Sequence, residues 1–94
     1  MPAYVVVEVN IHDPNLYEEY KKLTPSSIQE YGGEFLARGG KTLALEGNWD
    51  PERLVIIKFK DFETASNWWH SESYSKARAI RERAAATKML IIEG

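Results

Sequence analysis

The chain has no cysteine among its 94 residues, so neither a disulfide nor a thiolate can contribute to its structure or chemistry. No apolar run approaches the roughly 20 residues that a membrane-spanning helix needs. The formal net charge is only -2, which does not favour nucleic acid or an anionic membrane, because phosphate binding needs a basic face. Residues 1–4 lack the cationic start of a signal peptide, so we expect a cytoplasmic protein.

Metal ligands and phosphate-binding loops are equally scarce. The only two histidines, His12 and His70, fall in separate predicted loops, and neither belongs to a spaced cluster that would hold zinc or iron. Gly39-Gly40 precedes a predicted strand rather than a helix, which is the wrong context for a dinucleotide or Walker site. The sequence therefore predicts neither a bound metal nor a cofactor.

Apolar and aromatic side chains are plentiful by comparison. The chain has three tryptophans, five tyrosines and three phenylalanines, and 44% of its residues are apolar. This composition is enough to form a folded core. At this length, residues 1–94 make one domain that hides only about two thirds of the surface of the unfolded chain. The core is then thin, and a partner subunit would help to complete it.

Residue periodicity predicts alternating strands and helices. Strands are expected at 4–11, 34–38 with 43–46, 53–59 and 89–92, because β-branched and other apolar residues cluster there. Asp13 and Pro14 begin a first helix that ends at Gly32-Gly33, and we expect a kink or a restart at Pro25 with Thr24 as a second cap. Asp61 caps the next helix, and Ser71 caps a further segment over residues 72–85.

The order β-α-β-β-α-β predicts an α+β, ferredoxin-like fold with a four-stranded antiparallel sheet and helices on one face. The other face still carries apolar side chains, because the strands do not alternate cleanly with polar residues. A bare apolar face of that size is rare on a monomer. We therefore expect a homodimer that packs sheet against sheet as a dimeric α/β barrel, and we leave higher homo-oligomers open.

Several segments in one order carry a family resemblance: GGEFLARGG at 32–40, LEGNW at 45–49, RLVII at 53–57, ASNWW at 65–69, SESY at 71–74, Arg78, and the final Glu93-Gly94. Over essentially the whole chain the sequence resembles the domain of unknown function family 1330, of the dimeric α/β-barrel superfamily. The resemblance implies a ferredoxin-like fold and dimerisation through the sheets, and no known activity. Relatives by fold include cofactor-independent monooxygenases, lactone isomerases and haem-degrading enzymes, but a scaffold does not fix chemistry.

Two residues are candidates for proton transfer. His70 falls between two predicted helical segments beside aromatic residues, where it would act as general acid or base, although a solvent-facing linker residue is the commoner outcome. Glu8 lies within the first strand, and the family's fold places that strand beside the third. Glu8 would then pair with Lys58, as a structural ion pair or as a carboxylate poised in an apolar cavity.

Arginine and aromatic residues suggest ligand contacts. Arg38 is the best candidate for an anion clamp, with an ion pair to Glu46 as the alternative. Arg78 lies one turn from Arg81, and we expect at most one of the two to bind a ligand. The remaining candidates would form an aromatic wall, although core or interface packing explains such residues more often; they are Trp49, Trp69 and Tyr74.

Two functions fit these features. The first is a cofactor-independent enzyme, monooxygenase- or isomerase-like, that acts on a small acidic or aromatic molecule held by Arg38 and the aromatic wall. The second is a non-catalytic dimeric module that binds a small ligand or takes part in a stress response, with the aromatic residues packing the interface.

Overall fold

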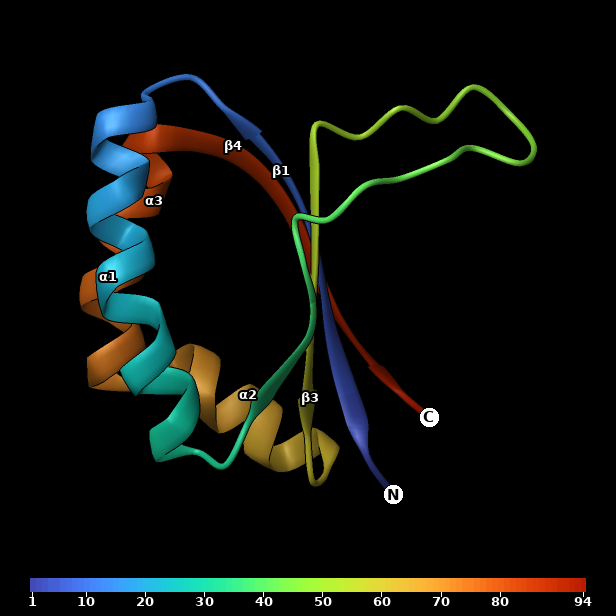
Figure 1. The fold of residues 1–94 in the computed structure, drawn as a ribbon. Helices are drawn as coiled ribbons and strands as arrows, with labels where there is room; N and C mark the ends of the chain where they lie inside the picture. Colours follow the sequence, from blue (N-terminus) through green and yellow to red (C-terminus); the bar gives the residue numbers. More distant parts are fainter.

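The computed structural model describes all residues from 1 to 94. Its elements follow the chain in this order: β1 (Ala3–Ile11), α1 (Pro14–Glu30), β2 (Glu34–Arg38), β3 (Arg53–Phe59), α2 (Phe62–His70), α3 (Glu72–Ala84) and β4 (Ala85–Glu93). The strands form one antiparallel sheet in the order β2-β3-β1-β4, and all helices lie on one of its faces (Figure 1). The predicted ferredoxin-like α+β fold is confirmed.

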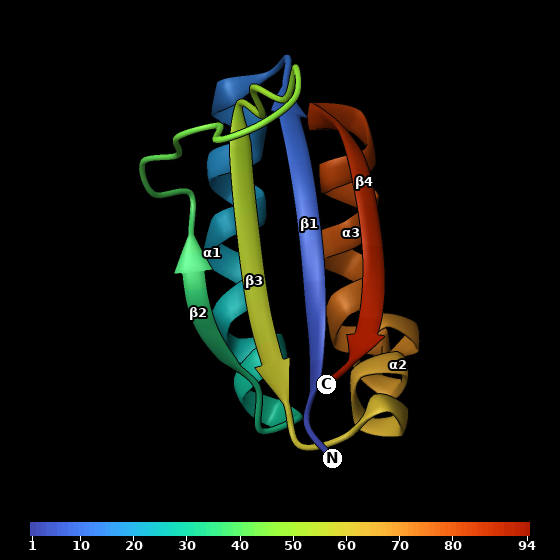
Figure 2. The ribbon, with the colours of Figure 1, turned by 90° about the vertical axis from the view of Figure 1, so that its right-hand side faces the viewer.

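The sheet has an inner face toward the helices and an outer face away from them. Side chains along β1 alternate between the two, and Val5, Val7 and Val9 are buried on the inner face. The outer face is also largely apolar. By register it carries Tyr4, Val6, Leu54, Ile56, Leu90 and Ile92, together with the charged Glu8, Lys58 and Lys88. Figure 2 shows the four strands side by side with this face toward the viewer. The outer face matches the apolar second surface expected from the sequence.

The strand register contradicts the predicted pairing of Glu8 with Lys58. Glu8 stands opposite Leu54 of β3, whereas Lys58 stands opposite Tyr4. Four residues along a strand separate the two charged positions by about 13 Å, so their side chains do not pair. The prediction placed the strands together correctly but had no means of fixing their register.

Helix α1 runs through Pro25 without a break, so the predicted restart and second cap at Thr24 are wrong. The Thr24 hydroxyl instead donates to the Tyr20 carbonyl at 2.8 Å, and the Ser27 hydroxyl donates to the Thr24 carbonyl at 2.8 Å. The carbonyl that loses its donor at Pro25 belongs to Lys21, four residues earlier, and neither side-chain bond reaches it; the helix continues through the loss of this one backbone bond. The first cap is as expected, because the Asp13 carboxylate accepts from the Leu16 N–H at 3.1 Å.

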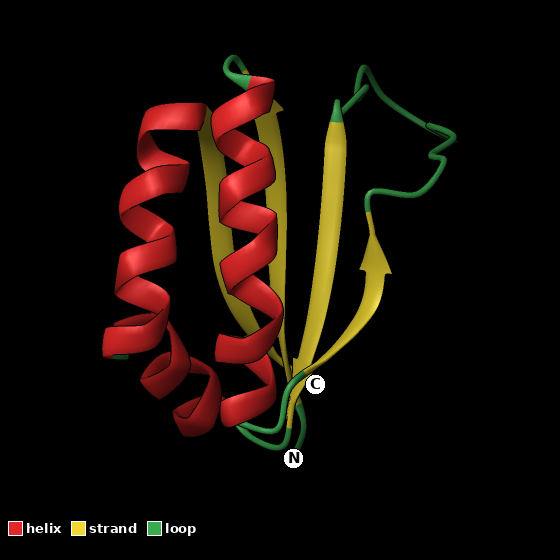
Figure 3. Ribbon diagram, turned by 60° about the vertical axis from the view of Figure 1, so that its left-hand side comes forward, coloured by secondary structure: helices red, strands yellow, loops and turns green.

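The other helix caps are confirmed. Asp61 accepts from the Thr64 N–H at 2.8 Å, and the Ser71 hydroxyl accepts from the Tyr74 N–H at 3.1 Å. Helices α1 and α3 lie side by side against the sheet (Figure 3).

Strand β4 begins at Ala85, four residues before the predicted start. Alanine favours a helix, but Ala85 and Ala86 pair with β1 and therefore belong to the strand. No helix is both long and apolar enough to cross a membrane.

Residues 39–52, which we call the arm, have no regular secondary structure. The predicted strand at 43–46 is therefore absent from the chain as it stands. The arm extends from the sheet on the side opposite the helices (Figure 1). Near its end the Trp49 indole N–H donates to Glu8 Oε1 on the outer face at 2.9 Å. This bond anchors the root of the arm to the sheet.

Candidate functional site

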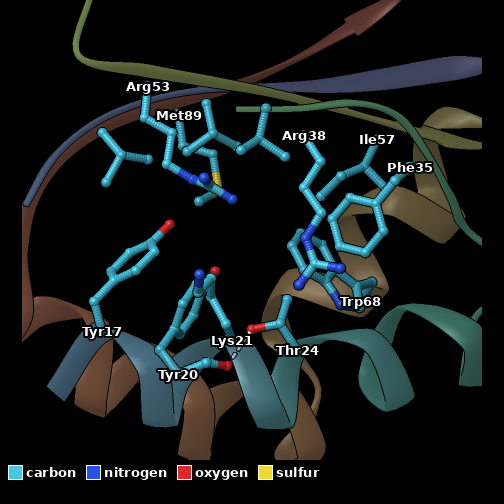
Figure 4. Close-up of a pocket in the computed structure, with 13 residues that line it drawn as sticks. Tyr17, Tyr20, Lys21, Thr24, Phe35, Arg38, Arg53, Ile57, Trp68 and Met89 are labelled. Atoms are coloured by element: carbon cyan, nitrogen blue, oxygen red, sulfur yellow. Dashed lines mark hydrogen bonds between the residues drawn. The ribbon is translucent and has the colours of Figure 1, made fainter. Parts of the chain in front are cut away.

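A pocket lies between α1 and the inner face of the sheet (Figure 4), and we call it the arginine pocket. Its walls are mostly apolar and include Phe35, Val55, Ile57, Trp68 and Met89. Its polar groups come from two layers: α1 supplies Tyr17, Tyr20, Lys21 and Thr24, and the sheet supplies Arg38 and Arg53. An apolar cleft with a few converging polar groups is the usual form of a small-molecule site.

The two guanidinium groups in the pocket have no acidic partner. Arg38 stacks on the Phe35 ring at 4.3 Å, and Arg53 lies 5.7 Å from the Tyr17 ring centroid. The only ion pairs are Lys21 with Glu18 and Arg78 with Glu82, and the buried Arg53 Nε has no hydrogen-bond partner. Cations with free donors in an apolar setting favour an anionic ligand, above all a carboxylate that can bind two N–H groups at once.

The hydroxyl of Tyr20, on the inner side of the pocket, pairs with a second tyrosine hydroxyl behind it. The Tyr20 hydroxyl lines the pocket and lies 2.9 Å from the Tyr74 hydroxyl, which is fully buried behind it. Burial, followed by the neighbouring Tyr74, raises the pKa of Tyr20 well above its ordinary value of 10.0. Tyr20 is therefore a neutral hydroxyl near neutral pH, able to donate a hydrogen bond into the pocket.

The pocket is narrow in this conformation. Its residues enclose about 400 Å³, counting space open to solvent, but only about 20 Å³ is wide enough for the centre of a water molecule. That is room for about one water. Arg38 is exposed and Arg53 half-buried, so these long side chains can move to admit a larger ligand.

His70 and Trp69 lie in a different place, a groove of about 270 Å³ between α2 and β4. His70 is exposed, and its Nδ1 lies 2.8 Å from the Ser66 carbonyl. Arg78 stacks on the Trp69 ring at 4.1 Å and pairs with Glu82 at 3.4 Å. None of these three predicted site residues lines the arginine pocket.

Glu8 and Trp49 lie on the outer face, where they line a second groove together with Leu54, Lys88 and Leu90. Tyr74 packs in the core with its ring 4.1 Å from that of Trp68. The single site that the sequence suggested, with Arg38, a proton carrier and three aromatic residues together, is therefore not assembled within one chain. Of the predicted residues, only Arg38 lines the arginine pocket.

Sequence reasoning missed most of this pocket, namely Tyr17, Tyr20, Lys21, Thr24 and Arg53. A signal was present, because positions 17, 20 and 24 form a helical stripe of hydroxyl-bearing residues where aliphatic ones are usual. Arg53 likewise opens a strand in which Lys58 is the only other charged residue. No group of three or more His, Cys, Asp or Glu side chains is placed to hold a metal ion.

Solved structures with the same fold cover nearly the whole chain. A protein of unknown function from Rhodopseudomonas palustris matches with a TM-score of 0.79 and 15% identity, over 99% of this chain and 82% of its own. SnoaB, a cofactor-independent oxygenase from Streptomyces nogalater, matches with 0.71 and 14%, over 99% and 92%. A dimeric ferredoxin-like protein of unknown function from Jannaschia sp. CCS1 matches with 0.77 and 13%, over 100% of both chains. At these identities the likeness shows the fold alone.

No curated protein sequence matches the chain. One family model does match, over residues 2–94, and its description is Domain of unknown function (DUF1330).

Proposed function

Because this chain belongs to the family described as Domain of unknown function (DUF1330), whose description names no activity, we propose a function from the arginine pocket itself. The chain binds a small acidic molecule with an apolar or aromatic body. It acts on that molecule as a cofactor-independent enzyme of the monooxygenase or isomerase type. The observation that carries the proposal is the pair of guanidinium groups, Arg38 and Arg53, that meet no carboxylate in an apolar pocket.

Each polar residue then has a role. Arg38 and Arg53 bind the carboxylate of the ligand, and Phe35 and Trp68 contact its apolar body. The Tyr20 hydroxyl donates to an oxygen of the ligand, and Tyr74 holds that hydroxyl in place through their 2.9 Å contact. SnoaB, which has the same fold, is a cofactor-independent oxygenase. The shared fold shows that such a scaffold can carry cofactor-independent chemistry, although a fold alone does not determine the reaction.

A non-catalytic ligand-binding or stress-related module is the second candidate. It is favoured by the position of His70 and Glu8, the two residues expected to move protons, because both lie outside the arginine pocket. Binding without turnover would distinguish it from the enzyme. Either function requires the same anion-binding pocket.

Ligand titration followed by tryptophan fluorescence tests the pocket, since Trp68 lines it. We expect benzoate, salicylate and 4-hydroxybenzoate to bind, and the uncharged benzamide to bind at least about tenfold more weakly, because a charged hydrogen bond contributes roughly 1.5–3 kcal/mol. Arg38→Gln and Arg53→Gln should each weaken carboxylate binding about tenfold. The matched control is Arg83→Gln, on an exposed position of α3. Equal affinities for acid and amide, or unchanged affinities in both pocket variants, would refute the proposal.

We also propose that the outer face pairs two copies of the chain. Its side chains Leu90 and Ile92 are 58% and 54% exposed, which is unusual for large apolar residues on one continuous strand. The Jannaschia protein with the same fold is described as dimeric, which supports this arrangement. Higher homo-oligomers and the cytoplasmic location stay predictions from the sequence.

A further inference from the structure

The arginine pocket holds more positive charge than a single carboxylate can neutralise. Its lining includes three cationic side chains, Arg38, Arg53 and Lys21, and no acidic side chain. One carboxylate brings one negative charge and two oxygen atoms, which two guanidinium groups already occupy. A ligand with one acidic group would therefore leave most of this positive charge uncompensated.

Lys21 lies on the opposite wall of the pocket from the two arginines. It belongs to α1, whereas Arg38 belongs to β2 and Arg53 to β3 (Figure 4). The Lys21 ammonium lies 2.9 Å from Oε1 of Glu18, one turn earlier on α1, and the Glu18 side chain is 61% exposed. An ion pair this open to water contributes little free energy, so an acidic group of a ligand can replace Glu18 as the partner of Lys21.

A fourth cation lies behind the pocket. Arg81 of α3 is only 7% exposed, its Nη1 donates to the Thr87 hydroxyl, and its buried Nε has no hydrogen-bond partner. No acidic side chain forms an ion pair with Arg81. Its charge also acts on Tyr20, which lines the pocket: burial is the largest influence on the pKa of Tyr20 and raises it, and Arg81 acts in the opposite direction. This buried charge therefore adds to the positive charge of the lining.

We propose that the ligand carries two acidic groups on its apolar body, one bound by Arg38 and Arg53 on the sheet and the other by Lys21 on α1. This inference deepens the proposed function and rests on it, because it concerns the same pocket. The walls between the cations are apolar and include Phe35 and Trp68. An apolar body that joins the two acidic groups fits these walls, whereas a small hydrated anion such as inorganic phosphate does not.

Titration calorimetry with phthalate, isophthalate and terephthalate tests the second acidic group, at about pH 8, where both carboxyl groups of each probe are ionised. These probes hold their two carboxylates at three different spacings on one ring. Each is compared with its carbamoylbenzoate, in which a neutral amide of nearly the same shape replaces one carboxylate. We expect at least one dicarboxylate to bind about tenfold more tightly than its amide at low salt, because it gains a charged hydrogen bond to Lys21.

Lys21→Gln removes the partner of the second acidic group and keeps both arginines. We expect it to abolish most of the advantage of the dicarboxylate, about tenfold, while the affinity for benzoate changes by less than about twofold. Lys22→Gln is the matched control, because Lys22 is the next residue of α1, is exposed and does not line the pocket. It should leave both affinities unchanged. Glutamine favours a helix about as well as lysine, so both variants should fold.

The results separate this inference from the proposed function. If benzoate binds but no dicarboxylate binds more tightly than its amide, the second acidic group is refuted and the pocket for a monocarboxylate stands. An advantage of the dicarboxylate that survives Lys21→Gln, or that falls equally with Lys22→Gln, also overturns the inference. If none of these acids binds, the proposed function fails and this inference fails with it.

Discussion

At the scale of single residues, the hydroxyl pair of Tyr20 and Tyr74 joins the arginine pocket to the core. Tyr74→Phe leaves the buried Tyr20 hydroxyl without this partner, so we expect a loss of about 1–2 kcal/mol in the free energy of unfolding. Urea denaturation measures the change. Tyr31→Phe is the matched control, because the Tyr31 hydroxyl makes no hydrogen bond within the chain and is not fully buried. Equal stability of the two variants would show that the pair contributes nothing.

The same pair predicts how stability depends on alkaline pH. Burial raises the pKa of Tyr20 above the 10.0 of an unfolded tyrosine, so the folded state keeps the proton longer than the unfolded state. The contribution to stability is complete below about pH 10 and is lost as the pH rises from there toward the folded pKa. Between pH 9 and pH 11, wild type should therefore lose more stability than Tyr20→Phe, measured by urea denaturation at each pH. Parallel losses would contradict the burial of this hydroxyl.

The role of a residue could be predicted from the sequence where it depends only on neighbours along the chain. Asp13, Asp61 and Ser71 cap helices as expected, because a cap depends only on residues within one turn. Arg38 was singled out because its planar guanidinium suits a carboxylate. Its neighbours in the pocket come from several elements far apart in the sequence, and the sequence alone does not show how these elements pack. Tyr74 was a candidate for an aromatic wall with core packing as the commoner outcome, and it packs in the core; nothing local separates these two outcomes.

At the scale of elements, the turn from α1 into β2 depends on a close contact at Gly33. A Cβ placed there would lie 2.6 Å from Phe59 Cε1 and 2.7 Å from Ile28 Cγ2, both in the core. Gly33→Ala should therefore cost about 1–3 kcal/mol of stability by overpacking, measured by urea or thermal unfolding. Gly40→Ala, where a Cβ meets no atom within 4 Å, is the control and should be nearly neutral. A neutral Gly33→Ala would show that the turn can shift.

Element existence followed from the sequence better than element limits did. Pro25 suggested a kink or a restart, but one helix runs through it from Pro14 to Glu30. The start of β4 was missed, because Ala85 and Ala86 suit a helix until strand pairing with β1 decides between the two states. The strand expected at 43–46 has the right pattern but no partner strand within the chain, so it does not form there.

At the scale of the whole molecule, the layered fold was predictable because the strands, helices and their order leave few arrangements of helices on one sheet. The register and the pocket were not, because they depend on how side chains far apart in sequence meet. The apolar outer face was also expected, and it is the feature on which the choice between a monomer and a dimer depends.

The outer face gives the last prediction. Leu90→Glu places a carboxylate on the outer face opposite Val6 of β1, and an interface that packs two sheets together would have to bury this charge in each subunit. We expect wild type at micromolar concentration to scatter light as about twice the 10.8 kDa chain mass, and the variant to behave as a monomer with dimer affinity at least about hundredfold weaker. Leu23→Glu, at an exposed leucine on α1 in the helix layer, is the control and should remain dimeric. A dimer that survives Leu90→Glu but dissociates with Leu23→Glu would place the interface on the helices instead of the sheet.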